Sequence, residues 1–256
     1  MTNPFTPFTP PNNIFDLTFL LVGNSGSGKT DFISKYTSGP VHFYMADKGG
    51  EKTIIKNMRK RNQTNISIDI MSDNKFNFSD FWAKYQEDEK VGKFEWLAKN
   101  NGILCIDSLT SLNLKGIKEI LIKDGAVPSG IGRKIDHRKG MNKPHWGQLL
   151  NWMQIFVSTL QDLPCAVAIT VHLHVLMNNK QEVVARYPAV NGQWRQLLPV
   201  DFDECYLLEF KQSTQTIHFK ERNKFEAKTR VFSMDKKKNP NMNDLVTAYL
   251  AEQDTF

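Results

Sequence analysis

Short apolar runs bounded by glycine, proline or polar residues recur along the first two thirds of the chain. Strands of a parallel sheet have this pattern, because helices cover both faces of such a sheet and leave neither face to water. The chain contains runs of this kind at residues 17–22, 41–46, 66–70, 103–106 and 166–171. We expect each of them to be a strand.

Apolar residues at helical spacing separate several of these runs. Leu149, Met153 and Phe156 fall on one stripe, which is typical of a helix that packs on a core. The same reasoning and the stop signals predict helices at residues 29–36, 79–98, 148–161 and about 242–252. In the second helix Ser79 is the expected N-cap and Gly92 is a weak point.

The strand pattern changes after residue 180. Shorter runs joined by turns follow at residues 183–187, 205–210, 216–220 and 226–232. Short strands joined by tight turns are typical of antiparallel pairing, so we expect them at one edge of the sheet. The pattern therefore predicts an α/β fold, with a mostly parallel central sheet flanked by helices and antiparallel strands toward the C-terminal edge. Residues 1–16 are expected to be an extension in front of a single domain at residues 17–256.

Composition agrees with this fold and excludes some classes of protein. With 40% apolar and 23% charged residues, the chain has the make-up of a packed globular domain. Its apolar runs are too short to span a bilayer and its first residues do not resemble a signal peptide, so we expect no membrane partner and a cytoplasmic location. Cys105, Cys165 and Cys205 lack metal-ligand spacing, which predicts buried, reduced thiols.

The loop after the first apolar run matches G-x-x-x-x-G-K-[ST] at every fixed position. It consists of Gly23, Asn24, Ser25, Gly26, Ser27, Gly28, Lys29 and Thr30. Its glycines let successive N–H groups face phosphate oxygens, and the start of the following helix adds its positive end. In this motif Lys29 contacts the β- and γ-phosphates and the Thr30 hydroxyl binds Mg²⁺. A strand before the motif and a helix after it favour this interpretation over a chance glycine-serine turn. We therefore expect ATP and Mg²⁺ as ligands.

A second acidic group for the metal is expected near this loop. The apolar run at residues 103–106 ends directly in Asp107, as a carboxylate that orders Mg²⁺ should. We expect Asp107 to bind a water on Mg²⁺ rather than the ion itself. The alternative is an ordinary surface Asp at a strand end.

Beyond these two motifs the chain resembles the RecA-like ATPases. Residues 107–112, an acid followed by Ser and an apolar helix start, are similar to that family, and residues 170–172 are similar to its strand with a γ-phosphate sensor. Residues 191–199, 202–207 and 228–230 are similar to small phage-type proteins with a RecA core, some of which anneal single-stranded DNA. The resemblance covers about residues 17–232, but only the first two motifs are specific.

The resemblance implies a RecA-like P-loop ATPase that binds single-stranded DNA, acts in phage-type recombination or annealing, and forms a homo-oligomeric ring or filament. It also implies that His172 senses the γ-phosphate, whereas the alternative is a locally hydrogen-bonded strand end. The chain departs from the family after the second strand, where Lys48 stands in place of a water-activating Glu. Asp47 or Glu51 can take that role, and we favour Asp47. Without either carboxylate the protein would act as an ATP-gated binder with slow turnover.

The segment in front of Trp146 is rich in cations. Its basic residues are Arg133, Lys134, Arg138, Lys139 and Lys143. A basic loop beside such a core can follow a phosphate backbone, and Trp146 can offer a stacking surface. The alternatives are a solvated loop and a tryptophan that anchors its helix in the core, and we favour the core for Trp146. The formal charge of +6 also agrees with a polyanionic partner, although many proteins without one carry such a charge.

Two later cations, Lys228 and Arg230, are candidates for a trans-acting role at the γ-phosphate of a neighbouring subunit. They can equally pair with acids such as Glu221 and Glu226. Other functions also stay open from the sequence: a helicase or packaging motor, a small-molecule or nucleoside kinase with the basic segment as its lid, and a nucleotide-gated scaffold. Because no accessory helicase motif is visible, the motor ranks behind the annealing function.

Overall fold

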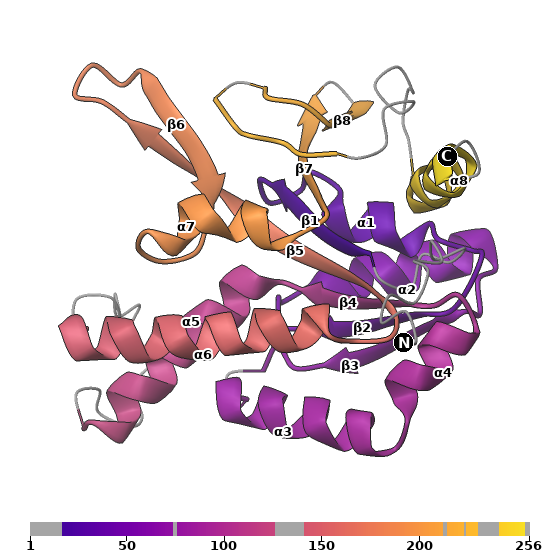
Figure 1. The fold of residues 1–256 in the computed structure, drawn as a ribbon, viewed down its shortest axis with the longest axis horizontal. Coiled ribbons are helices and arrows are strands. Elements are labelled where there is room, and N and C mark those ends of the chain that lie inside the picture. Colours follow the sequence, from indigo (N-terminus) through magenta and orange to yellow (C-terminus); the bar gives the residue numbers. More distant parts are fainter. Residues whose placement is uncertain are drawn as a thin grey trace, which may run out of the picture.

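The fold consists of a central sheet with helices packed on both of its faces (Figure 1). The computed structural model describes residues 17–73, 76–125, 141–211, 214–222, 224–229 and 241–253. Within them the strand order is β3-β2-β4-β5-β1-β7-β8, and β6 pairs with β5 off this path. The strands are β1 (Thr18–Gly23), β2 (Val41–Met45), β3 (Ile66–Ile70), β4 (Ile103–Asp107), β5 (Ala166–Met177), β6 (Val183–Pro188), β7 (Glu204–Lys211) and β8 (Thr214–His218). The helices are α1 (Lys29–Ser34), α2 (Gly50–Arg61), α3 (Phe78–Lys90), α4 (Lys93–Lys99), α5 (Leu109–Lys123), α6 (Lys143–Gln161), α7 (Trp194–Leu197), the 3-10 helix η3 (Leu198–Asp201) and α8 (Met242–Gln253).

Two apolar cores lie on opposite faces of the sheet. Successive side chains of a strand point to opposite faces, and in β1 Leu20 and Val22 belong to one core while Phe19 and Leu21 belong to the other. Helices α3 to α6 pack on the first core, and α1, α2 and α8 pack on the second. The expected α/β architecture, with a mostly parallel sheet covered on both faces, is therefore confirmed.

The parallel part of the sheet extends one strand further than the sequence predicts. β7 pairs parallel with β1, and only its other side pairs antiparallel, with β8. The prediction that residues 205–210 belong to an antiparallel group was therefore wrong for the β1 side. After β6 the chain passes through α7 and η3 and comes back to the sheet at Asp203. The Asp203 carboxylate accepts hydrogen bonds from Thr18 N at 3.0 Å and Thr18 Oγ1 at 2.9 Å. This return brings β7 to the end of the sheet where β1 begins, so both strands run in the same direction.

The last predicted strand, at residues 226–232, is not a strand in the residues that the structure describes. Residues 224–229 form isolated bridges, one between Lys228 and Cys205 and one between Phe225 and Arg222. The remainder, residues 230–232, lies outside the described part of the chain.

β5 is longer than the apolar run that predicts it. It continues past Val171 to Met177, and its second half pairs antiparallel with β6, with Leu173 opposite Pro188. Figure 1 shows this β5–β6 hairpin projecting from the sheet. The sequence hides the extension because His172 and His174 interrupt the apolar run, while Leu176 and Met177 beyond them are exposed.

Glycine and a side-chain cap change the helix predicted at residues 79–98. Gly92 has a φ of 74°, a left-handed conformation that interrupts a helix and separates α3 from α4. Asn77 caps α3 in place of Ser79, because its side chain accepts a hydrogen bond from the backbone N–H of Asp80.

Two further helices differ from the apolar pattern. α6 begins at Lys143, ahead of the predicted residue 148, because the Asn142 side chain caps the helix and Pro144 suits its first turn. α2 follows β2 although the pattern predicts no helix there. Ile54 is its one buried residue, so α2 lacks an apolar stripe in the sequence.

Candidate nucleotide-binding and catalytic site

The carboxyl ends of four parallel strands bring the predicted site residues to one edge of the sheet. Gly23 at the end of β1 lies beside His172 of β5, Asp107 at the end of β4 lies beside Thr170 of β5, and Met45 of β2 lies beside Asp107. β5 thus separates the strand of the phosphate loop from the strand of the predicted metal acid. Ligands of open α/β sheets bind at this edge.

The predicted phosphate loop has the backbone that its glycines permit. Gly26 and Gly28 have φ values of 77° and 86°, which only glycine adopts without strain. Gly28 immediately precedes α1, so the N–H groups of the first helical turn face the loop. The Lys29 ammonium donates to the carbonyl oxygens of Gly23 at 2.8 Å and Asn24 at 3.0 Å. Burial lowers the pKa of Lys29, although the carboxylates around it act in the opposite direction.

A residue that the sequence does not predict supports this loop from β8. Gln215 is buried, and its Nε2 donates to the carbonyl oxygens of Ser27 at 3.1 Å and Gly28 at 3.0 Å. A side chain at Gly28 would collide with the Gln215 amide. No motif marks Gln215 in the sequence, because its role depends on how β8 sits against a loop far away in the chain.

Asp107 lies at the centre of the site and is buried. It accepts hydrogen bonds from the Thr30 hydroxyl and the Thr170 hydroxyl, each at 2.5 Å. Burial raises the pKa of the Asp107 carboxyl, and the two hydroxyl donors oppose this without cancelling it. The oxygen atoms of Thr30 and Asp107 are ligands that suit Mg²⁺, directly or through water. Thr170 is the second residue that sequence reasoning misses, since only the register of β4 and β5 brings it to Asp107.

Asp47 and His172 form a second polar group beside the phosphate loop. His172 Nε2 and Asp47 Oδ2 are 3.0 Å apart. Asp47 also accepts from Ser108 Oγ at 3.0 Å and from Ser111 Oγ. Burial by itself would raise the pKa of the Asp47 carboxyl. The hydrogen bonds to Asp47 outweigh burial and lower this pKa, and the bond from His172 contributes most among them. Asp47 is therefore ionised at neutral pH.

A cavity of about 400 Å³ joins these groups. Lys29, Thr30, Asp47, Asp107 and His172 all line it, together with the loop that precedes α2. Lys48 is also in its wall, whereas Glu51 is absent from it. Of the two carboxylates considered as water-activating groups, Asp47 is therefore the one that reaches this cavity.

Most of the cations predicted to bind DNA lie outside the described residues. Arg133, Lys134, Arg138 and Lys139 belong to residues 126–140, which the structure does not describe. Lys143 is exposed and is the first residue of α6. Trp146 is partly buried and packs against the apolar core, as expected.

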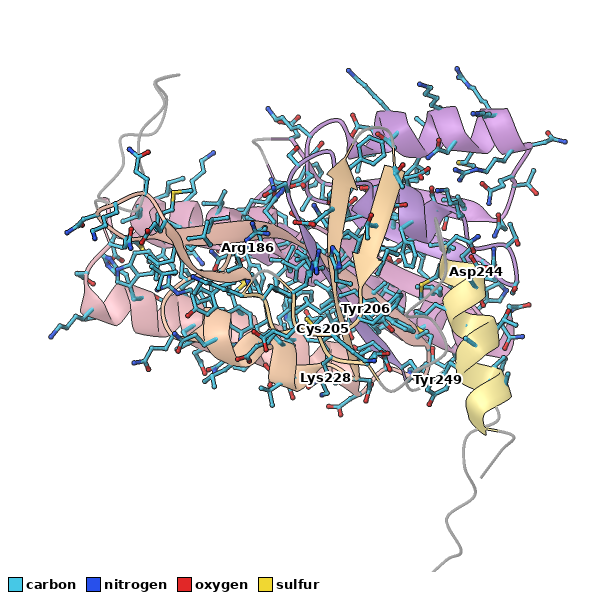
Figure 2. The ribbon with its side chains drawn as sticks, turned by 90° about the horizontal axis from the view of Figure 1, so that it is seen from above. Arg186, Cys205, Tyr206, Lys228, Asp244 and Tyr249 are labelled. Atoms are coloured by element: carbon cyan, nitrogen blue, oxygen red, sulfur yellow. The ribbon has the colours of Figure 1, made fainter. Side chains whose placement is uncertain are left out.

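Of the two cations considered for a trans-acting role, only Lys228 is described. Its ammonium donates to the Phe202 carbonyl at 2.6 Å, and its backbone pairs with Cys205 near the start of β7. Figure 2 shows Lys228 beside Cys205. Arg230 lies outside the described residues, so a trans-acting role for either cation stays a prediction. The three cysteines are free and buried, as expected, and no described helix is long and apolar enough to cross a membrane.

One comparison with known proteins identifies a family for this chain. A family model described as an AAA domain matches residues 16–231, which is well over half of the chain. No curated protein matches the sequence.

The chain is also similar to two solved structures of ATPases. One is a prototypical ATPase from the type III secretion system of pathogenic bacteria, with 12% identity and a TM-score of 0.46 over 77% of this chain and 52% of the other. The second is the assembled ATPase EscN from the type III secretion system of enteropathogenic E. coli, with 13% identity and a TM-score of 0.42 over 75% of this chain and 43% of the other. The chain thus spans about half the length of these structures or less. By its family match and its phosphate loop, the chain belongs to the AAA domain family and is a P-loop ATPase.

Proposed function

We propose that this ATPase acts on single-stranded DNA, in phage-type recombination or annealing, and that DNA binding controls its turnover. The observation that carries the proposal is the basic segment that enters α6, with five cations at residues 133–143 against the single acid Asp136. Such a density of positive charge favours a phosphate backbone, because each cation that meets a phosphate releases a counterion. Lys143, the described member of this set, is exposed at the first turn of α6.

The roles that we propose for the residues around the nucleotide follow from their contacts in the cavity. The loop N–H groups and Lys29 bind the β- and γ-phosphates, and Thr30 and Asp107 hold Mg²⁺. When bound, Mg²⁺ neutralises charge on the phosphate oxygens. Asp47 is ionised and orients the attacking water, and His172 positions the Asp47 carboxylate through its 3.0 Å contact.

The link between DNA and turnover is supported by the position of α5. Its first turn holds Ser111, which donates to Asp47, and Thr110, whose hydroxyl accepts from His172 N at 3.0 Å. The same helix packs against α6 on the shared core, so a strand bound near the start of α6 lies one helix away from the catalytic carboxylate.

The rate of ATP hydrolysis by the purified protein, with and without single-stranded DNA, tests the proposal. Turnover that rises with DNA and disappears in Lys29→Ala is the expected result, since this change removes the ammonium from the phosphate loop. Turnover that DNA leaves unchanged would refute the DNA-directed function. Transfer of phosphate to a nucleoside in the absence of DNA would replace it with the kinase function.

A further inference from the structure

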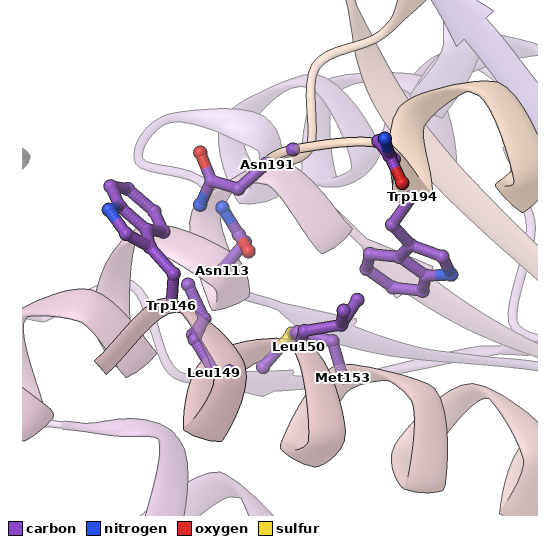
Figure 3. Close-up of a pocket in the computed structure, with 10 residues that line it drawn as sticks. Asn113, Trp146, Leu149, Leu150, Met153, Asn191 and Trp194 are labelled. Atoms are coloured by element: carbon purple, nitrogen blue, oxygen red, sulfur yellow. The ribbon is translucent and has the colours of Figure 1, made fainter. Parts of the chain in front are cut away.

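A second cavity, of about 450 Å³, lies on the α5–α6 side of the molecule. It is lined by the beginning and middle of α6, one residue of α5, the turn at residues 191–193 and Trp194 at the start of α7. Figure 3 shows the amides of Asn113 and Asn191 between the indole rings of Trp146 and Trp194, with Leu150 nearby on α6. We call this cavity the α5–α6 pocket. It shares no lining residue with the nucleotide cavity.

The chemistry of the α5–α6 pocket fits a flat, neutral ring with polar edges. All its described lining residues are uncharged, so it offers no opposite charge to a phosphate or a charged side chain. Indole rings stack on flat heterocycles. Asn113 is 2% exposed, and Asn191 Nδ2 is buried without a hydrogen-bond partner among the described residues. An amide combines a donor and an acceptor, the pattern that pairs with the edge of a nucleobase.

The walls of this pocket connect to the nucleotide site through His172. Ala189 N, two residues before Asn191, donates to the His172 carbonyl at 2.7 Å. On the other side His172 N donates to Thr110 Oγ1, and Asn113 follows Thr110 by one turn of α5. Any ring that contacts both Asn113 and Asn191 therefore touches the two segments that hold the backbone of His172.

We infer that the α5–α6 pocket binds one unstacked base of the DNA strand and that its occupancy acts on ATP turnover through His172. The inference rests on the proposed function, because it assumes that the strand runs past the start of α6. The exposed Lys143, one turn before Trp146 in α6, provides a cation for the phosphate of the same nucleotide.

Leu150 and Ile155 supply a matched pair of variants for the test. Both belong to α6 and are exposed, Leu150 by 37% and Ile155 by 50%. Leu150 lines the α5–α6 pocket, whereas Ile155 lines a separate groove with Phe78 and Trp82. Leu150→Trp therefore fills the pocket, and Ile155→Trp adds the same bulk to the same helix outside it. Asn191→Ala removes the amide whose Nδ2 has no partner among the described residues, without adding bulk.

The readout is a ratio of affinities within each protein, measured by fluorescence anisotropy with labelled oligothymidine and an abasic strand of equal length, about 20 nucleotides. Both strands carry the same phosphates, so binding of the abasic strand reports the backbone contacts and the integrity of the variant. In the wild type we expect oligothymidine to bind about tenfold more tightly, the order expected for one stacked base. Ile155→Trp should keep this ratio. Leu150→Trp should bring it close to one with abasic binding retained, and Asn191→Ala should lower it.

The outcomes separate the inference from the proposed function. If the wild type binds neither strand and DNA does not affect its turnover, both the base pocket and the DNA-directed function are refuted. If the wild type prefers oligothymidine and both pocket variants keep that preference, the base pocket is wrong while the DNA-directed function stands. If free adenosine quenches indole fluorescence in the wild type but not in Leu150→Trp, and the strand ratio is unchanged in that variant, the pocket takes a free nucleoside and the inference is overturned.

Discussion

Replacing His172 by alanine isolates one contact of the catalytic site. The change deletes the imidazole, whose Nε2 lies 3.0 Å from Asp47 Oδ2, and spares the two hydrogen bonds of the His172 backbone to Thr110 and Ala189. The Lys29 and Thr30 side chains are also left in place. We therefore expect ATP binding to persist while the chemical step slows.

The structure bounds the size of this effect. A hydrogen bond to a charged group contributes about 1.5–3 kcal/mol. Because the His172 side chain is 30% exposed and that of Asp47 is 21% exposed, water can replace part of the lost contact and the lower figure applies. About 1.5 kcal/mol in the transition state corresponds to a fall in kcat of about tenfold. The KM for ATP should change by less than about threefold, because the phosphate contacts are not touched.

The pH profile of kcat provides a second, independent readout. Among the groups that lower the pKa of Asp47, the His172 hydrogen bond comes first, so its loss raises that pKa. Activity requires ionised Asp47, and the acid limb of the profile must then move to higher pH. His174→Ala is the matched control, since His174 is exposed two residues further along β5 and is absent from the nucleotide cavity. A His172→Ala protein with wild-type kcat and an unmoved acid limb would refute the role assigned to the Asp47–His172 pair.

Two further predictions concern the loop support and the pH dependence of stability. Gln215→Ala removes the hydrogen bonds to the Ser27 and Gly28 carbonyls, each contributing about 1 kcal/mol, so the Kd for ATP should rise about thirtyfold. Calorimetric titration measures this Kd, and an unchanged value would contradict the support role of Gln215. Burial, then the Lys93 ammonium, lowers the pKa of His42 to about 4, so between about pH 6.5 and 4 the unfolded chain binds a proton that the folded chain excludes. The stability that neutral His42 contributes is therefore present above about pH 6.5 and is lost as the pH falls to about 4, a loss on the order of 3 kcal/mol. Urea denaturation at several pH values should show this fall in the free energy of unfolding. His42→Asn should make the fall less steep, and an equally steep fall in that variant would exclude His42 as its source.

The sequence predicts those parts of the site that lie within one short segment. The phosphate loop is contiguous from Gly23 to Thr30, and Asp107 is marked by the buried strand that it ends. Thr170 and Gln215 depend instead on strand register and on a contact between distant segments, which no local pattern records.

The parts of the fold that the sequence predicts are likewise those marked by a local pattern. Buried strands are visible as apolar runs, so the order of β1 to β5 in the sequence is predicted well. The parallel pairing of β7 with β1 depends on the path of the connection into β7, where Asp203 accepts a hydrogen bond from Thr18 of the neighbouring strand β1. The apolar pattern does not predict helix α2, because this helix buries a single side chain, Ile54. It does not predict the extension of β5 either, because that part of the strand lies outside the core.

The length of β5 has a mechanical consequence. A single strand supplies Thr170 to Asp107 and His172 to Asp47, and then continues to Met177 at the end of the β5–β6 hairpin, where the side chain is 55% exposed. At about 3.3 Å per residue, Thr170 and Met177 are about 23 Å apart along one strand paired on at least one side. Paired strand backbone therefore connects the β5–β6 hairpin directly to the partners of both carboxylates, with no loop between Thr170 and Leu176.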